Sequence, residues 1–185
     1  MVVLSPLLLV VALGVKASSP GPIFYRGVRT GRLGVPFRIF KFRTMVDGGE
    51  KLGGGTTALN DPRVTRIGHY LRRYKIDELP QLINIFRGEM SIVGPRPELP
   101  AYTALYSPDE RRILTMRPGL TDQSSLRFFS LEQEVGDIEA DGNYERNVFP
   151  VKNRLRLEYV STASFAGDLS LIWQTLRRVL VRPVR

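Results

Sequence analysis

The first fifteen residues constrain the fold of this chain most, because they carry no charge and are almost entirely apolar. Only Ser5, Pro6 and Gly14 interrupt the run. As a helix, the segment would be about 22 Å long, which is shorter than the roughly 30 Å hydrocarbon core of a bilayer. We therefore predict a helix that dips into one leaflet of a membrane and does not cross it.

Two other interpretations of this segment were considered. A secretory signal peptide needs basic residues before its apolar stretch, and none is present here. A buried core helix stays open as an alternative. Against it stand Lys16 and the basic residues that follow, which suit anionic lipid headgroups. These are Arg26, Arg29, Arg32, Arg38, Lys41 and Arg43.

The composition excludes several classes of site. A chain of 185 residues fits one domain with a real core. It has no cysteine, which rules out disulfides and thiolate metal sites. The single histidine, His69, rules out a multi-histidine metal site and is expected at the surface or in a cap. The formal charge of +9 predicts an anionic partner, namely nucleic acid, lipid or a phosphorylated small molecule.

Local patterns predict an α+β fold that is mostly helical, with one small β-hairpin. Breaker residues 18–22 end the apolar segment, and strands at 23–28 and 36–42 flank a turn at 30–34. Residues 47–60 are rich in Gly and Thr and are expected to be a mobile loop without a P-loop motif. Helical spacing of apolar residues marks 65–74, where Ile67, Tyr70 and Leu71 share a face, and the segment that begins at Asp77.

The second half of the chain is harder to interpret. A short helix is expected at 108–114, and longer helices at 151–160 and 169–180. Residues 132–141 carry five acids and are expected to form a solvated loop. Trp173, with Arg177, Arg178, Arg182 and Arg185, indicates either a second membrane contact or core packing of the tryptophan.

Adjacent carboxylates beside arginines are the strongest chemical signal in the sequence. Asp77 and Glu78 could simply complement a helix dipole, but helix capping does not need the many cations around them. A metal-assisted attack on a phosphate ester needs both groups. A helix start and the nearby Arg72 would keep Asp77 ionised, and the stiff turn 93–97 would hold Arg96 for phosphate oxygens. The flanking arginines are Arg63, Arg66, Arg72, Arg73, Arg87 and Arg96.

Five motifs in this chain, in this order, resemble those of the bacterial sugar transferase family, the monotopic phosphoglycosyl transferases. The similarity runs from about residue 18 to about residue 180. The motifs are Lys-Phe-Arg-Thr-Met at 41–45, Asn-Asp-Pro-Arg-Val-Thr-Arg-Ile-Gly at 60–68, Asp-Glu-Leu-Pro-Gln-Leu at 77–82, Ser-Ile-Val-Gly-Pro-Arg-Pro at 91–97 and Arg-Pro-Gly-Leu-Thr at 117–121.

The resemblance implies a function: transfer of a phosphosugar from a UDP-sugar to a polyprenol phosphate such as undecaprenyl phosphate, with release of UMP. It implies that Asp77 is the nucleophile of a covalent intermediate, and that Glu78 assists. Both carboxylates would hold Mg²⁺. Phosphate binding is expected from Arg72, Arg96, Lys41 and, with less support, Arg117. The location implied is the cytoplasmic face of a bacterial inner membrane.

The chain also departs from the family pattern. Ser5 and Pro6 match the pair that breaks a re-entrant membrane helix, but only four residues precede them. We therefore expect a truncated membrane segment, residues 1–17, in which Ser5 is an N-cap, followed by a catalytic domain at 18–185. Tyr74-Lys75-Ile76 replaces the usual Thr-Ser-Leu, so that Lys75 either tunes phosphate affinity or faces solvent.

Two other functions were weighed. A membrane-associated protein could bind a nucleotide sugar without turning it over. A basic nucleic-acid-binding domain is the other, because Arg and aromatic residues alternate in the expected hairpin. Nothing else in the sequence resembles a nucleic-acid fold, so no nucleic-acid partner is expected.

Overall fold

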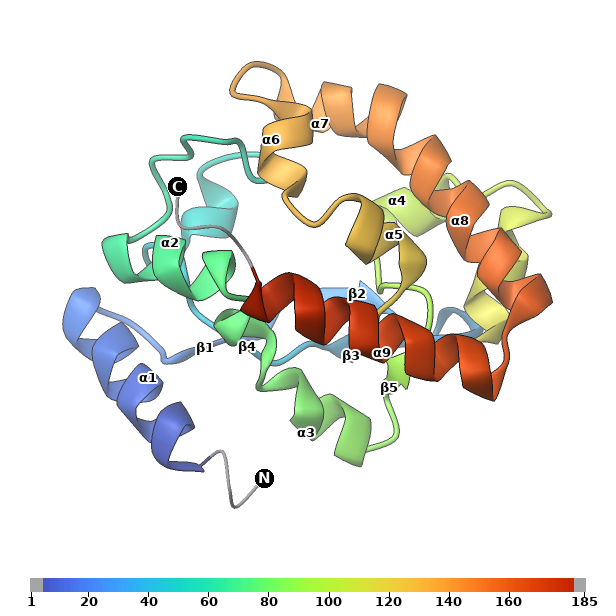
Figure 1. The fold of residues 1–185 in the computed structure, drawn as a ribbon. Coiled ribbons are helices and arrows are strands. Elements are labelled where there is room, and N and C mark those ends of the chain that lie inside the picture. Colours follow the sequence, from blue (N-terminus) through green and yellow to red (C-terminus); the bar gives the residue numbers. More distant parts are fainter. Residues whose placement is uncertain (1–4, 182–185) are drawn as a thin grey trace.

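Helices supply most of the ordered structure in residues 5–181, the part of the chain that the computed structural model describes (Figure 1). The helices are α1 (Ser5–Ser18), α2 (Arg66–Arg73), α3 (Gln81–Phe86), α4 (Pro100–Ala104), α5 (Gln123–Arg127), α6 (Leu131–Val135), α7 (Ala140–Asn143), α8 (Phe149–Thr162) and α9 (Phe165–Leu180). The 3-10 helices are η2 (Arg32–Gly34), η3 (Gly49–Lys51), η4 (Ile76–Glu78) and η5 (Glu110–Thr115), and η6 (Tyr144–Val148) is a π-helical turn.

The predicted hairpin is confirmed. Strands β2 (Val28–Thr30) and β3 (Pro36–Arg38) pair antiparallel, and β1 (Phe24–Tyr25) and β4 (Lys41–Phe42) continue the same register further from the turn. The turn contains Leu33 at φ 56° and Gly34 at φ 79°, and left-handed backbone of this kind is cheapest for glycine. The hairpin delivers Lys41 and Phe42 to the middle of the molecule.

A second strand pair brings distant segments together. Strands β5 (Ser91–Val93) and β6 (Gly119–Thr121) run parallel, with Ser91 opposite Gly119 and Val93 opposite Thr121. The backbones approach closely just beyond this pair, since a Cβ on Gly119 would lie 2.2 Å from the backbone nitrogen of Gly94. The segments that follow both strands therefore leave the pair side by side.

The core is divided among three clusters of buried side chains. One joins α1 to α2 and β4 through Val11, Val15, Phe42 and Leu71. A second, around Tyr102, Phe128, Tyr144 and Phe149, joins α4, α5, η6 and α8. The third, Phe37, Ile39 and Met90, packs the hairpin against the end of α3.

Helix α1 lies at the edge of the molecule and packs with one face only (Figure 1). Val11 and Val15 are buried against the first cluster, whereas Leu7, Leu9, Val10 and Leu13 are exposed. The core-helix interpretation therefore accounts for only part of its apolar surface. None of the helices within residues 5–181 is long and apolar enough to cross a membrane. Residues 1–4 of the predicted segment lie outside the described part.

The two long C-terminal helices and the short helix near residue 110 are confirmed, but other expectations were wrong. Residues 132–141 include α6 and α7 in place of a solvated loop, because Val135 is buried in the second cluster. Tyr70 is 67% exposed and does not join the apolar face of α2. Trp173 is 68% exposed, which excludes core packing. Arg182 and Arg185 lie outside the described residues.

A close contact between α2 and the hairpin should make Gly68 intolerant of substitution. A Cβ at this position would lie 2.1 Å from the carbonyl oxygen of Thr44, which accepts a hydrogen bond from the backbone of Thr65. We expect Gly68→Ala to lower the free energy of unfolding by about 1–3 kcal/mol, as overpacking does, when measured by chemical denaturation. The control is Gly142→Ala, where the new Cβ meets only the flexible end of Arg146. Equal stability of the two variants would contradict the expectation.

Candidate active site

Asp77 and Glu78 lie in the 3-10 turn η4. The prediction that they begin an α-helix was therefore wrong. The turn follows Lys75, which has φ 56°, and α3 begins only at Gln81, after Pro80. Pro80 cannot donate a backbone hydrogen bond, which fits its place between the two elements. Asp77 and Glu78 are 5% and 8% exposed, yet both line a cavity of about 1150 Å³.

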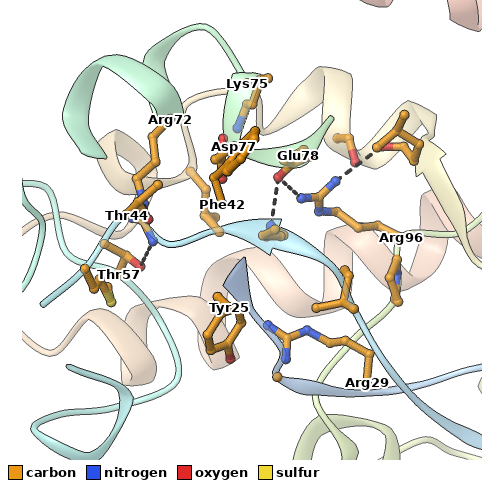
Figure 2. Close-up of a pocket in the computed structure, with 18 of the residues that line it drawn as sticks. Tyr25, Arg29, Phe42, Thr44, Thr57, Arg72, Lys75, Asp77, Glu78 and Arg96 are labelled. Atoms are coloured by element: carbon orange, nitrogen blue, oxygen red, sulfur yellow. Dashed lines mark hydrogen bonds and ion pairs between the residues drawn. The ribbon is translucent and has the colours of Figure 1, made fainter. Parts of the chain in front are cut away.

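Glu78 is the centre of an ion-pair cluster. Its Oε1 atom accepts from Lys41 Nζ at 2.9 Å and also from Arg96 Nη2. Figure 2 shows the Arg96 guanidinium pointing toward this carboxylate. Lys41 comes from β4 and Arg96 from the segment after β5. Burial alone would raise the pKa of Glu78, but the charges of Arg96 and Lys41 outweigh it and hold the pKa well below the usual range. Glu78 is therefore ionised and fixed in place.

Asp77 is in a different electrostatic state. Its Oδ1 atom is buried and has no hydrogen-bond partner among residues 5–181. Burial, with the charge of Glu78 added to it, raises the pKa of Asp77 to about 6, although Lys41, Lys75 and Arg72 oppose the shift. The sequence predicted that a helix start and Arg72 would keep Asp77 ionised, and it gave no sign that burial raises the pKa of this group. At neutral pH the carboxylate is still mainly ionised, and it is poorly solvated.

Arg72 lies on the other side of Asp77 from Arg96 (Figure 2). Its Nε donates to Thr44 Oγ1 at 2.9 Å and its Nη2 donates to Thr57 Oγ1 at 3.1 Å. Its third nitrogen, Nη1, is 3.6 Å from the carboxylate of Glu132 on α6. These bonds hold the guanidinium at the cavity wall, where phosphate oxygens can meet it.

Arg96 is fixed through both its backbone and its side chain. Its backbone nitrogen donates to Asp122 Oδ2 at 3.1 Å, and its Nη1 donates to the carbonyl oxygen of Leu120 at 3.3 Å. Asp122 in turn is the N-cap of α5 and lies 3.8 Å from Arg156 Nε. The stiffness that the sequence predicted for the turn is therefore supported by a buried network.

The structure brings Lys41, Arg72, Asp77, Glu78 and Arg96 to one cavity. Arg117 is exposed and does not belong to the cavity wall. Lys75 does line the cavity, with its Nζ 5.2 Å from the centre of the Phe129 ring. His69 is exposed, as predicted.

Sequence reasoning missed three charged residues near Arg96, namely the buried Asp122 and Arg156 and the partly buried Glu98. Arg156 Nη2 donates to Glu98 Oε1 at 2.7 Å, and its side chain has no exposed surface. The spacing of charges along the chain gives no sign of this pairing, because the partners are far apart in sequence. The only local signal was the place of Glu98 directly after the Pro-Arg-Pro turn.

The donor set of the site fits a hard divalent cation. Within residues 5–181 no group of three or more His, Cys, Asp or Glu side chains gathers to form a full protein cage. Mg²⁺ usually needs only one or two carboxylates, because water and substrate phosphates complete its shell. The unpartnered Oδ1 of Asp77 offers such a ligand, whereas Oε1 of Glu78 is already shared by two cations.

The raised pKa of Asp77 predicts a pH-dependent cost to stability. A carboxyl group whose folded pKa is about 6 and whose ordinary value is 3.8 favours folding below pH 3.8, and this contribution is lost as the pH rises through 6. Asp77→Asn, which stays neutral, should therefore increase the free energy of unfolding at pH 8 by up to about 3 kcal/mol. Chemical denaturation at pH 5 and pH 8 measures this difference. The gain should shrink at pH 5.

A matched control for that measurement is Asp109→Asn, since this aspartate, directly before η5, is largely exposed and forms an ion pair with Arg112 at 3.0 Å. It should change stability little at either pH. A gain for Asp77→Asn that is the same at both pH values would contradict the assignment of burial as the cause.

Comparisons with known proteins show the family to which the chain belongs. Residues 1–182 match the family model described as bacterial sugar transferase. The chain is 36% identical over 181 residues to the UDP-glucose:undecaprenyl-phosphate glucose-1-phosphate transferase of Caulobacter vibrioides, an alignment that covers 95% of this chain and 63% of that protein. It is 35% identical to the Escherichia coli enzyme of the same name, covering 95% of this chain and 36% of that one.

A third relative has nearly the same extent as this chain. The exopolysaccharide production protein PSS of Rhizobium leguminosarum bv. phaseoli is 37% identical over 193 residues, covering 98% of this chain and 90% of that protein. The chain thus spans less than two thirds of the first two relatives but nearly all of the third. Because the family model matches residues 1–182 of its 185, the chain belongs to the bacterial sugar transferase family.

Proposed function

We propose that this protein transfers a sugar 1-phosphate from a UDP-sugar to undecaprenyl phosphate, as the first membrane step in the assembly of a polysaccharide or glycoconjugate. The observation that carries the proposal is the buried, unpartnered Oδ1 of Asp77 in a cavity that also presents Lys41, Arg72 and Arg96. The names of the relatives from Caulobacter and Escherichia coli support the same substrates.

Asp77 is the nucleophile in this proposal. Its carboxylate oxygen attacks the phosphorus that bears the sugar, and the bond from that phosphorus to the bridging oxygen breaks, so that UMP leaves with the electron pair. A phosphate oxygen of the lipid acceptor then attacks the same phosphorus and releases the Asp77 carboxylate. Two displacements allow a water-soluble donor and a membrane-bound acceptor to react in turn.

The cations around Asp77 reduce the electrostatic barrier to this attack. A carboxylate and a diphosphate repel each other, so the phosphate oxygens need fixed positive charge on the way to the transition state. Arg72 and Arg96 lie on opposite sides of Asp77, and guanidinium groups bind phosphate oxygens with directed hydrogen bonds. Lys41 adds a third positive charge, although its ammonium group is already paired with Glu78. Arg117 lies outside the cavity and takes no part in this proposal.

Mg²⁺ is the proposed cofactor, with Asp77 and Glu78 as the residues that would hold it. When bound, the ion supplies charge neutralisation at the phosphate oxygens. Asp77 provides the open oxygen, and Glu78 contributes through its negative charge beside it.

A membrane surface is the proposed location, on the cytoplasmic face of a bacterial inner membrane. Besides the exposed side of α1, the outer face of α9 presents Phe165, Leu169, Trp173 and Leu180, beside the basic Arg177 and Arg178. The adjoining residues on the same apolar side of the helix, Ile172, Leu176 and Val179, line the cavity. An amphipathic helix of this kind can rest in the interface of an anionic bilayer. It would place the mouth of the cavity where a lipid phosphate can reach it.

The proposed reaction is tested by the intact mass of the protein after incubation with Mg²⁺ and a panel of UDP-sugars, without lipid acceptor. We expect one sugar-phosphate increment in the wild type and none in Asp77→Asn, because the amide cannot form the acyl phosphate. Asp109→Asn, an exposed change of the same kind, should form the adduct as the wild type does. An adduct in Asp77→Asn would assign the nucleophile to another residue.

The same experiment separates the enzyme from a protein that only binds nucleotide sugars. Binding without turnover predicts no mass increment and no UMP with any donor in the panel. Release of UMP together with the increment supports the transferase.

Membrane contact through α9 is tested by the fluorescence of Trp173, the only tryptophan of the chain. Because this side chain is exposed, its emission should shift to shorter wavelength when vesicles containing phosphatidylglycerol are added. The double variant Leu169→Ser and Leu180→Ser should reduce the shift, since it removes apolar surface from the same face. Ser161→Ala and Thr162→Ala together, at the exposed end of α8, serve as the control. An unchanged emission spectrum with vesicles would contradict the contact.

A further inference from the structure

The cavity that holds Asp77 continues past Arg96 to a second group of polar side chains. Glu98, Tyr144 and Lys152 all line it. The Tyr144 hydroxyl donates to Glu98 Oε1 at 2.5 Å, and Lys152 Nζ donates to the Tyr144 oxygen at 3.5 Å. Tyr144 is the first residue of the π-helical turn η6, an irregularity that is frequent at functional sites.

Arg156, and not Lys152, is the cation in direct contact with Glu98. Arg156 already donates to Glu98 Oε1 at 2.7 Å, and the Arg156 side chain is fully buried. Burial alone would raise the pKa of Glu98, but Arg156 and Lys152 together with the Tyr144 hydrogen bond lower it to about 2. One guanidinium and one phenol would satisfy an ordinary buried carboxylate. Arg156 also lies 3.8 Å from Asp122, so Lys152 balances the charge of the second carboxylate, but no carboxylate accepts a hydrogen bond from its ammonium group among the described residues.

Lys152 is poorly satisfied for a buried ammonium group. It is 5% exposed, and the long bond to Tyr144 is its only hydrogen bond among residues 5–181. Its other contact is the Tyr144 ring, whose centre lies 4.8 Å from Nζ. An ammonium group has three N–H donors, so at least two find no oxygen or nitrogen acceptor in the described part of the chain. Burial lowers the pKa of Lys152 to about 8, which reflects the cost of holding the charge away from water. A ligand acceptor in the cavity would offset that cost.

Glu98 offers the complementary group. Its two hydrogen bonds, from Tyr144 and Arg156, both end on Oε1, so within the described part of the chain Oε2 is left to accept another. The cavity wall thus presents a fixed acceptor and a fixed donor near each other, beyond the cations that face Asp77. Neutral groups with a donor beside an acceptor match this arrangement.

We propose that Glu98 and Lys152 form a recognition site for the uncharged, hydrogen-bonding part of the donor substrate, separate from the phosphate-binding cations. This inference rests on the proposed transferase function. The chemistry it recognises is an adjacent donor and acceptor, which both the imide edge of uracil and a pair of sugar hydroxyls provide. Tyr144 and Arg156 position Glu98 in this site and do not themselves contact the substrate.

The first test measures protection of Lys152 in the unmodified full-length protein. Lysines are methylated with formaldehyde and a borane reductant, and the labelled peptides are quantified by mass spectrometry, with and without UMP, glucose 1-phosphate or each UDP-sugar of the panel. We expect a bound ligand to slow labelling of Lys152 at least fivefold, while the exposed Lys51 is labelled at the same rate. Inorganic phosphate should protect Lys41 without protecting Lys152.

The separate ligands identify the group that is recognised. Protection by UMP alone assigns the site to uracil, and protection by glucose 1-phosphate or by the covalent sugar-phosphate form after removal of UMP assigns it to the sugar. Unchanged labelling of Lys152 with UMP and with every UDP-sugar overturns the proposal. Protection without any covalent adduct on Asp77 would instead contradict the proposed reaction and leave this site standing.

The second test uses Lys152→Met, which keeps most of the side-chain volume and removes the donors. We expect about a tenfold rise in the donor concentration that gives half-maximal adduct formation, with the maximal rate within twofold of the wild type, as for the loss of one charged hydrogen bond. Lys51→Met, with the same charge change at an exposed position, should change neither quantity. Thermal melting of both variants checks folding. An unaltered donor dependence in a folded Lys152→Met protein would also overturn the proposal.

Discussion

The shared contact of Lys41 and Arg96 with one oxygen of Glu78 is the interaction on which the rest of the site depends. It ties together the last strand of the hairpin, the 3-10 turn η4 and the segment after β5, which lie far apart in the sequence. Two cations on one carboxylate leave a net positive charge beside Asp77. The adjacent aspartate can therefore stay buried without a hydrogen bond on Oδ1 and remain mainly ionised near neutral pH.

A second layer of buried charge supports the first. Arg156 lies between Glu98 and Asp122, and Asp122 accepts a hydrogen bond from the backbone N–H of Arg96. Buried ion pairs often add little net stability, because desolvation offsets their attraction, but removal of one member leaves an uncompensated charge. Their effect here is geometrical. They fix the direction in which the chain leaves β5, and with it the position of the Arg96 guanidinium.

The parts of the fold that local chemistry determines were predictable from the sequence. The hairpin followed from β-rich runs around glycines, and α2, α8 and α9 followed from the spacing of apolar residues. The residues gathered around Asp77 were predicted by the resemblance more than by any pattern, and their roles stay predictions. The pairing of Glu98 with Arg156 was not predictable, because it depends on how α8 packs on the segment after β5. The raised pKa of Asp77 was not predictable for a related reason, since burial is a property of the folded chain.

Helix α1 reaches the site through very few contacts. It packs on α2 so closely that a Cβ on Gly14 would lie 2.7 Å from the side chain of Ile67, and its buried valines pack in the cluster that contains Phe42 and Leu71. Phe42 is next to Lys41 in sequence, and Leu71 is next to Arg72. The first cluster therefore links α1 directly to the two segments that carry these cations. A bilayer that sets the depth of α1 would, through this packing, also set the height of the Asp77 carboxylate above the lipid.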